Sequence, residues 1–201
     1  MKVLVAYATK HGATQGIAGK IAQTLTDEGL DVTLERAEDA RSLASYDAFV
    51  IGSAAYMYHW LKEAAQLVRT NVDTLTSRPT WIFSSGPIGT DLVDAKGRDV
   101  IEASEPAEFK EFVPLIKPRD AAVFFGAFDP DQPPIGLAER MGRWFIQSKI
   151  VKESIPAGDF RDWPKIADWA RGIARELKGT PSAITGAQPD HGTKFASQRS
   201  L

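Results

Sequence analysis

Apolar and polar residues follow one another along the chain in a pattern that predicts strands and helices in turn. Short apolar runs or alternations, typical of strands in a buried parallel sheet, occupy five segments. These are Lys2–Ala8, Asp31–Arg36, Ala48–Gly52, Thr80–Ser84 and Ala121–Phe128. Apolar residues at helical spacing fill residues 17–25, 61–75, 109–116 and 163–177. This order predicts an α/β fold, a doubly wound five-stranded parallel sheet with helices on both faces.

Two segments lie outside this plan. Asp129–Gly136 is rich in Pro and Gly and is expected to form a loop, followed by an extra helix over Leu137–Lys149. From Gly179 onward the chain contains few large apolar residues, which is typical of disorder. We therefore expect one domain over residues 1–178 and a disordered tail over 179–201.

Composition narrows the classes of function. A formal net charge of -2 argues against a nucleic-acid binder, which normally carries a basic excess. The chain has no cysteine, which excludes disulfides, thiolate nucleophiles and iron–sulfur or cysteine–zinc sites. No apolar run approaches the roughly 18–20 residues that span a bilayer, and the start lacks a signal-peptide pattern. We expect a cytoplasmic protein with no metal site.

The first strand is followed by a polar loop of sequence Thr-Lys-His-Gly-Ala-Thr-Gln at residues 9–15. Hydroxyl groups, a glycine and the start of a helix together suit a terminal phosphate, because backbone N–H groups and the helix dipole attract an anion there. The candidate ligands are Thr9, Lys10, His11, Gly12, Ala13 and Thr14. The alternative is a Ser/Thr N-cap in a tight turn, which most βα units need.

Other phosphate motifs do not fit. A P-loop requires a hydroxyl residue after Gly-Lys, but Ile21 follows Gly19-Lys20. The dinucleotide fingerprint fails because the first two glycines, Gly12 and Gly16, are too far apart. We expect Gly16 and Gly19 to allow close packing of the helix on the sheet. A phosphate-accepting receiver domain is excluded because its acidic residues are missing.

The loop at residues 9–14 resembles the phosphate loop of flavodoxins, Thr/Ser-x-Thr-Gly-x-Thr, with His11 at a Thr position. The resemblance implies a flavodoxin-like sheet of strand order 2-1-3-4-5 and flavin mononucleotide (FMN) as a non-covalently bound cofactor. Ligands of such sheets bind beyond the carboxyl ends of the strands, where the strand order reverses.

The loops after strands three and four agree with a flavin site. Small residues there allow close backbone approach to a planar ring, and Tyr56 or Tyr58 is placed to stack on it. The candidate ligands are Ser53, Ala54, Ala55, Tyr56, Tyr58, Ser84, Ser85, Gly86 and Pro87. An aromatic cluster that caps the sheet edge is the alternative. The loop after strand four has no aromatic residue, which leaves one flavin face open to a substrate.

A narrower resemblance covers residues 1–178. The segments 123–128, 143–145 and 158–163 are similar to flavodoxin-domain proteins related to the menaquinone-dependent protoporphyrinogen oxidase. From the residues alone, Asp159 or Asp162 is expected to cap the last helix, and Arg161 to pair with a neighbouring carboxylate. The basic amphipathic helix over 137–149 is expected either to lie on a membrane surface or to pack on this domain or a second subunit.

Three functions remain open. The first is an FMN oxidoreductase that oxidises a porphyrinogen-like or other reduced small molecule and passes electrons to a quinone. The second is a flavodoxin-type electron carrier without its own substrate. The third is a binding module that has lost its flavin, which Thr9, Gly12 and Thr14 argue against. No catalytic base stands out; Tyr58 and His59 are the candidates by position, and His59 is expected to be structural.

Overall fold

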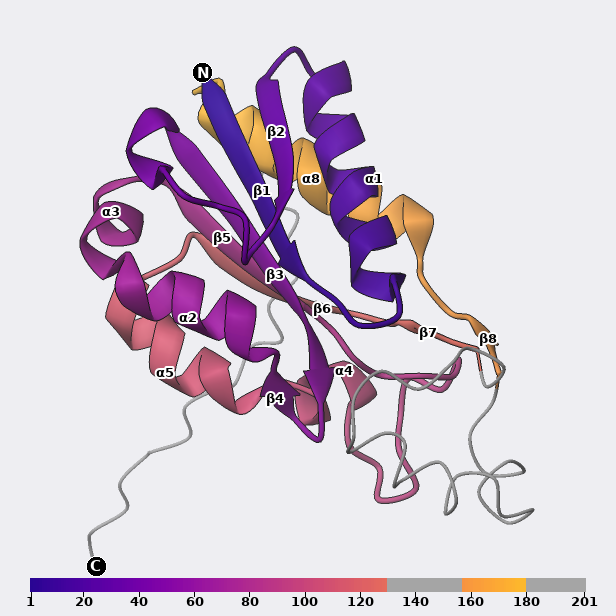
Figure 1. Cartoon of the computed structure of the whole chain (residues 1–201). Coiled ribbons are helices and arrows are strands. Elements are labelled where there is room, and N and C mark those ends of the chain that lie inside the picture. The colour runs from indigo at the N-terminus through magenta and orange to yellow at the C-terminus, as the bar shows by residue number, and fades with distance from the viewer. Residues whose placement is uncertain (130–156, 180–201) are drawn as a thin grey trace, which may run out of the picture.

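The computed structural model describes residues 1–129 and 157–179, in which a parallel sheet lies between two layers of helices (Figure 1). The five parallel strands run in the order β2-β1-β3-β5-β6. Their bounds are β1 Lys2–Ala8, β2 Asp31–Arg36, β3 Ala48–Tyr56, β5 Thr80–Ser85 and β6 Asp120–Phe124. The predicted order 2-1-3-4-5 is confirmed, because the added strand β4 (His59–Trp60) takes one number and pairs only with β3.

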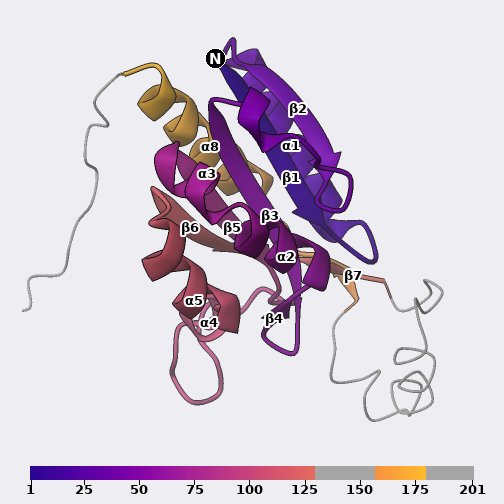
Figure 2. The same ribbon diagram turned by 60° about the vertical axis from the view of Figure 1, so that its left-hand side comes forward.

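Buried apolar strands hold the helices on both faces. On one face, α1 (Ala13–Asp27) packs beside α8 (Trp163–Leu177) over Val3, Val5 and Val50. On the other, α2 (Lys62–Thr70), α3 (Val72–Ser77) and α5 (Ala107–Ile116) cover Leu4, Phe49 and Ile51. In Figure 2, α2 and α3 lie in front of the sheet, and α1 and α8 lie behind it. Successive residues of a strand therefore point alternately into two hydrophobic cores, one on each face of the sheet.

The long helix expected over 61–75 is two helices. Asn71 separates α2 from α3, and its Nδ2 donates to the Leu67 carbonyl at 2.8 Å. The Asn71 side chain thus bonds the Leu67 carbonyl, which in an unbroken helix would accept a backbone N–H. Short helices at Leu43–Ser45 and at α4 (Val100–Ala103) were not predicted.

The strand expected over 121–128 also divides. β6 ends at Phe124, and β7 (Ala127–Phe128) pairs antiparallel with β8 (Gly158–Asp159) in a separate ribbon. The cause is Gly126, whose N–H donates to the Pro87 carbonyl at 2.8 Å and whose carbonyl accepts from Phe160 N at 3.0 Å. These bonds turn the chain out of the sheet.

Three expectations concern residues that the structure does not describe. The loop over 129–136, apart from Asp129, and the helix over 137–149 lie outside the described residues, as does the tail from residue 180. Within the described residues, no helix is both long and apolar enough to cross a membrane.

Candidate functional site

The loop between β1 and α1 is built around Gly12. Gly12 has a left-handed backbone, with φ of 83°, which a glycine adopts without strain. Its N–H donates to Thr9 Oγ1 at 3.0 Å, and its carbonyl accepts from Gly16 N at 3.0 Å. The Thr9 hydroxyl therefore shapes the loop, and the helix begins directly after the turn.

The first turn of α1 has no side-chain cap, and no acidic residue lies in it. This argues against the alternative of a Ser/Thr N-cap. Thr14 is fully buried, and its Oγ1 has no hydrogen-bond partner among the described residues. A buried hydroxyl without a partner is costly, and Thr14 lies at an uncapped helix start, where backbone N–H groups suit an anion.

Beyond β3 the chain forms a hairpin, which the sequence did not reveal. Tyr56 pairs with His59, and the two-residue turn consists of Met57 and Tyr58, with φ of 50° and 63°. Asn-Gly is the usual sequence for such a turn, because both residues need a left-handed backbone. The turn exposes 91% of Met57 and 61% of Tyr58 at its tip.

Glu108, at the start of α5, fixes this hairpin. Its Oε2 accepts from Trp60 N at 2.9 Å, and its Oε1 lies 3.2 Å from His59 Nδ1. Ala107 N also donates to the Tyr58 carbonyl at 2.8 Å. His59 thus has the structural role expected of it. Glu108 was missed because it lies 48 residues from its partner Trp60 and resembles an ordinary first-turn acid.

The loop after β5 lies beside this hairpin, since Ala54 pairs with Ser85 in the sheet. Ser84 is fully buried, and its hydroxyl has no hydrogen-bond partner among the described residues. A Cβ on Gly86 would lie 3.6 Å from Ala55 Cβ, and Pro87 is held through its carbonyl by Gly126. Ser53 differs, because its hydroxyl already bonds Leu61 N and the Ala54 carbonyl.

Two of the predicted ligand loops touch. The Lys10 ammonium lies 4.5 Å from the centre of the Tyr56 ring, a cation–π distance. The loop at 9–14, the β3–β4 hairpin and the loop at 84–87 all follow the carboxyl ends of parallel strands. The structure therefore gathers the predicted residues at one edge of the sheet, where α/β sheets bind ligands.

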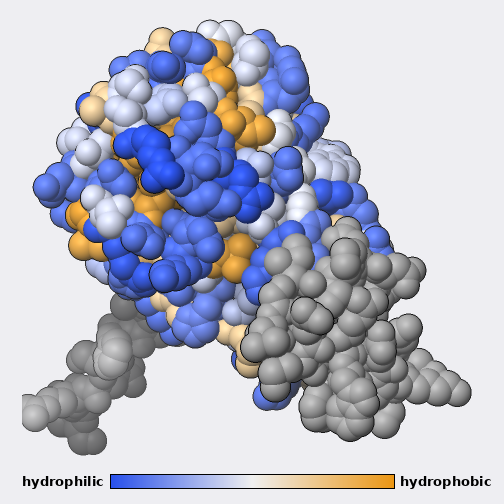
Figure 3. Space-filling view, in the orientation of Figure 1, coloured by the Kyte–Doolittle hydropathy of each residue, from blue (hydrophilic) through white to orange (hydrophobic). Residues whose placement is uncertain are grey.

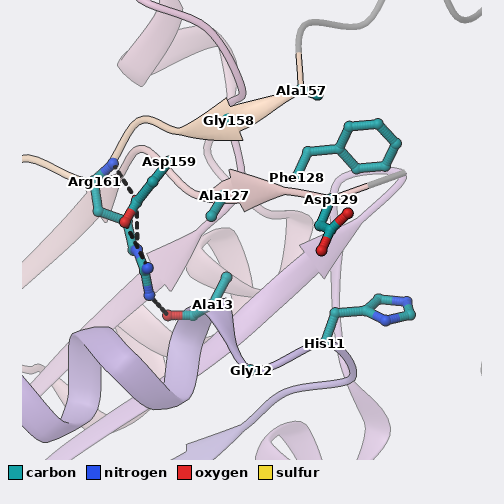
Figure 4. A pocket seen from close by; sticks show the side chains of 10 residues that line it. All are labelled: His11, Gly12, Ala13, Ala127, Phe128, Asp129, Ala157, Gly158, Asp159 and Arg161. Carbon is teal, nitrogen blue, oxygen red and sulfur yellow. Dashed lines mark hydrogen bonds and ion pairs between the residues drawn. The ribbon is translucent and has the colours of Figure 1, made fainter. Parts of the chain in front are cut away.

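A cavity of about 630 Å³ opens beside the start of α1 (Figure 4). His11, Gly12 and Ala13 line one side, and the β7–β8 ribbon lines the other. Arg161 spans the two, with Nε and Nη2 donating to Asp159 and Nη1 donating to the Ala13 carbonyl at 3.2 Å. These bonds from Arg161 lower the pKa of the Asp159 carboxyl.

The structure confirms both predictions made for the segment around Arg161 and corrects the one made for Gly16 and Gly19. Asp162 caps α8 by accepting from Lys165 N, as expected of one of two candidates, whereas Asp159 is the partner of Arg161. Gly16 does allow a close approach, but of Arg161 and not of the sheet. The prediction for Gly19 is wrong, because a Cβ there would meet nothing within 4 Å.

Comparison with models of known protein families shows which family the chain belongs to. The model of the flavodoxin domain family matches residues 4–151. The chain belongs to this flavodoxin family. No curated protein matches the chain.

Three solved structures are similar in fold. A flavodoxin from the domain Archaea has 16% identity and a TM-score of 0.51, with 89% of this chain and 99% of that chain covered. A mutant of flavodoxin from Pseudomonas aeruginosa has 14% identity and a TM-score of 0.51, covering 89% and 100%. Rubredoxin oxygen:oxidoreductase from Desulfovibrio gigas has 16% identity and a TM-score of 0.53, covering 90% of this chain but 37% of that one.

Membership of the flavodoxin family implies FMN as the cofactor and a role in flavin-dependent electron transfer. The described residues fit the phosphate of FMN, because an uncapped helix start carries the buried, unpartnered hydroxyl of Thr14. Ser84 supplies a second unpartnered hydroxyl at the same edge of the sheet. No group of three or more candidate metal ligands occurs among the described residues.

Proposed function

We propose that this flavodoxin-family chain is an FMN-dependent oxidoreductase that exchanges electrons with an apolar small molecule, a quinone or a porphyrinogen-like reductant. The observation that carries the proposal is a set of exposed apolar residues in the β3–β4 hairpin and in the loop after β5, which we call the rim. It consists of Tyr56, Met57, Tyr58, Ile88, Leu92 and Val93, each with more than a third of its surface exposed. Exposed apolar groups that gather at a site favour an apolar partner.

The phosphate of FMN would be held by the N–H groups at the start of α1 with the Thr9 and Thr14 hydroxyls. His11 is a candidate for a further contact because it lines the same cavity. Lys10, over the Tyr56 ring, contributes a positive charge beside the loop. The N–H groups carry the positive end of the helix dipole, and no acidic residue in the first turn opposes it.

The flavin ring would lie between the hairpin and the loop at 84–87. Bound FMN supplies the electron-accepting centres, and the protein supplies orientation and exclusion of water. Tyr56 or Tyr58 is the stacking partner that we propose, with Ala54, Ala55 and Gly86 leaving room for close backbone approach. Figure 3 shows a mostly hydrophilic surface with scattered hydrophobic patches over the face that it presents.

Rapid mixing tests the proposal. The holoprotein, reduced without oxygen, is mixed with a water-soluble naphthoquinone, and the return of oxidised flavin absorbance is followed. We expect reoxidation that saturates with quinone concentration and is slowed by Met57→Lys at unchanged FMN content. The control is Leu115→Lys, which changes an exposed apolar residue of α5 outside the rim.

Reoxidation that does not saturate, or that Met57→Lys leaves unchanged, would contradict the oxidoreductase proposal. Fast one-electron exchange with a protein acceptor and none with the quinone would instead support the electron carrier.

A further inference from the structure

Arg161 joins parts of the chain that are far apart in sequence. Its guanidinium grips Asp159 through two parallel N–H···O bonds, both 2.7 Å long. Its third donor, Nη1, reaches the carbonyl of Ala13, 148 residues earlier. The guanidinium carbon also lies 4.4 Å from the centre of the Trp163 ring. Asp159 and Trp163 thus fix the guanidinium, which in turn holds the first turn of α1.

Gly16 provides the space for this contact. A Cβ at Gly16 would lie 2.3 Å from Arg161 Nη1, far inside the contact distance of real atoms. Glycine costs a helix roughly 1 kcal/mol relative to alanine, so a glycine in the second turn of α1 needs a reason. The space taken by Arg161 supplies that reason, and it relates Gly16 to the segment Gly158–Trp163.

The contact acts on the turn that presents N–H groups to the phosphate. Ala13 and Gly12 line the cavity together with Arg161 (Figure 4). The charge of Arg161 is balanced by Asp159, and only 17% of its side chain is exposed. Arg161 is therefore placed to hold the loop in its binding shape, which lowers the cost of ordering the loop when a ligand binds.

We propose that Arg161 is a positioning residue for the FMN phosphate, acting through the Ala13 carbonyl. Asp159 holds the guanidinium in place, and the missing side chain of Gly16 leaves room for it. This rests on the proposed cofactor site. The proposal predicts that loss of the contact weakens binding of the phosphate and not of the flavin ring.

The test compares FMN with riboflavin, which lacks the phosphate. Dissociation constants of both are measured by quenching of flavin fluorescence for the full-length apoprotein and its variants. We expect Arg161→Ala to weaken FMN binding about tenfold, the factor typical of one lost charge-assisted hydrogen bond, and riboflavin binding much less. Arg171→Ala is the control, since Arg171 pairs with Asp168 on the same helix, α8.

Gly16→Ala is a second variant that is expected to remove the contact of Arg161 with Ala13 and so weaken FMN binding. The added Cβ displaces the guanidinium, and alanine is a better helix former than glycine, so the fold is retained. We expect a similar selective loss of FMN affinity, with no further loss when Gly16→Ala and Arg161→Ala are combined. Gly19→Ala is the matched control, because its Cβ would meet nothing within 4 Å.

Unchanged FMN affinity in Gly16→Ala, or an equal loss for FMN and riboflavin, would overturn the positioning role and leave the cofactor site standing. If the wild-type chain binds neither flavin, the cofactor site itself is wrong, and the positioning role is overturned with it.

Discussion

Lys10 and Tyr56 meet beyond the carboxyl ends of β1 and β3, with the Lys10 ammonium 4.5 Å from the centre of the Tyr56 ring. This contact ties the loop after β1 to the hairpin after β3. A cation–π pair at a partly exposed position is worth about 0.5–1 kcal/mol. We expect a double-mutant cycle of Lys10→Met and Tyr56→Leu to give a coupling of that size in the free energy of unfolding of the apoprotein. Zero coupling would show that the two loops move independently.

Thr14→Val separates a binding role from a structural one. Valine has nearly the shape of threonine and removes a buried hydroxyl that has no partner among the described residues. We expect the apoprotein to be as stable as the wild type or more so, because burying an unpaired hydroxyl costs about 1–3 kcal/mol. FMN affinity should fall roughly tenfold with the lost hydrogen bond to the phosphate. Thermal unfolding and FMN titration measure the two effects.

A loss of stability in Thr14→Val without a loss of FMN affinity would contradict this assignment. Ser84→Ala serves as a companion variant, since its hydroxyl is equally buried and unpartnered among the described residues.

The turn at Met57-Tyr58 stores backbone strain. Non-glycine residues in a left-handed conformation cost about 1–2 kcal/mol each, and Asn-Gly relieves that cost. We therefore expect Met57→Asn with Tyr58→Gly to raise the free energy of unfolding by about 1–2 kcal/mol, measured in urea. The same variant removes exposed apolar surface from the rim, so reoxidation by the quinone should slow. A more stable variant with unchanged reoxidation would place the substrate contact elsewhere.

Glu108 holds the hairpin mainly as a hydrogen-bond acceptor. Glu108→Ala leaves the buried N–H of Trp60 without its partner, which costs about 1–3 kcal/mol. Glu108→Gln retains a carbonyl acceptor and should lose less. Hydrogen exchange at the Trp60 amide and urea unfolding measure the difference. Equal losses in both variants would show that the charge beside His59, and not the acceptor, fixes the hairpin.

Arg161 also sets a pH dependence. Its hydrogen bonds lower the pKa of Asp159 in the folded chain, so this pair stabilises the fold fully above the ordinary Asp value of about 3.9. The stabilisation is lost as the pH falls through the lowered pKa. Carboxyl-carbon NMR should therefore find a pKa for Asp159 below the ordinary value in the wild type. Arg161→Ala should return it toward that value; an unchanged pKa in the variant would contradict the pairing.

The apolar pattern was enough to predict the sheet, because parallel strands buried on both faces are nearly continuous apolar runs, as Val3–Ala6 and Phe49–Ile51 show. The loop after β1 could be singled out because its residues are contiguous, and its binding of phosphate stays a prediction. The hairpin was not, because Met57-Tyr58 lacks the usual turn residues. Arg161 was expected to pair with a carboxylate, but its contact with Ala13 depends on tertiary packing that local sequence does not encode.

The central claim is that this flavodoxin-family chain holds FMN at the uncapped start of α1. The most direct measurement is the visible absorbance of the purified chain after incubation with FMN, with the released flavin identified after denaturation, for the wild type and Thr14→Val side by side. We predict one FMN per wild-type chain and a reduced content in Thr14→Val. A colourless wild-type chain that takes up no FMN, or equal FMN in both, would contradict the account.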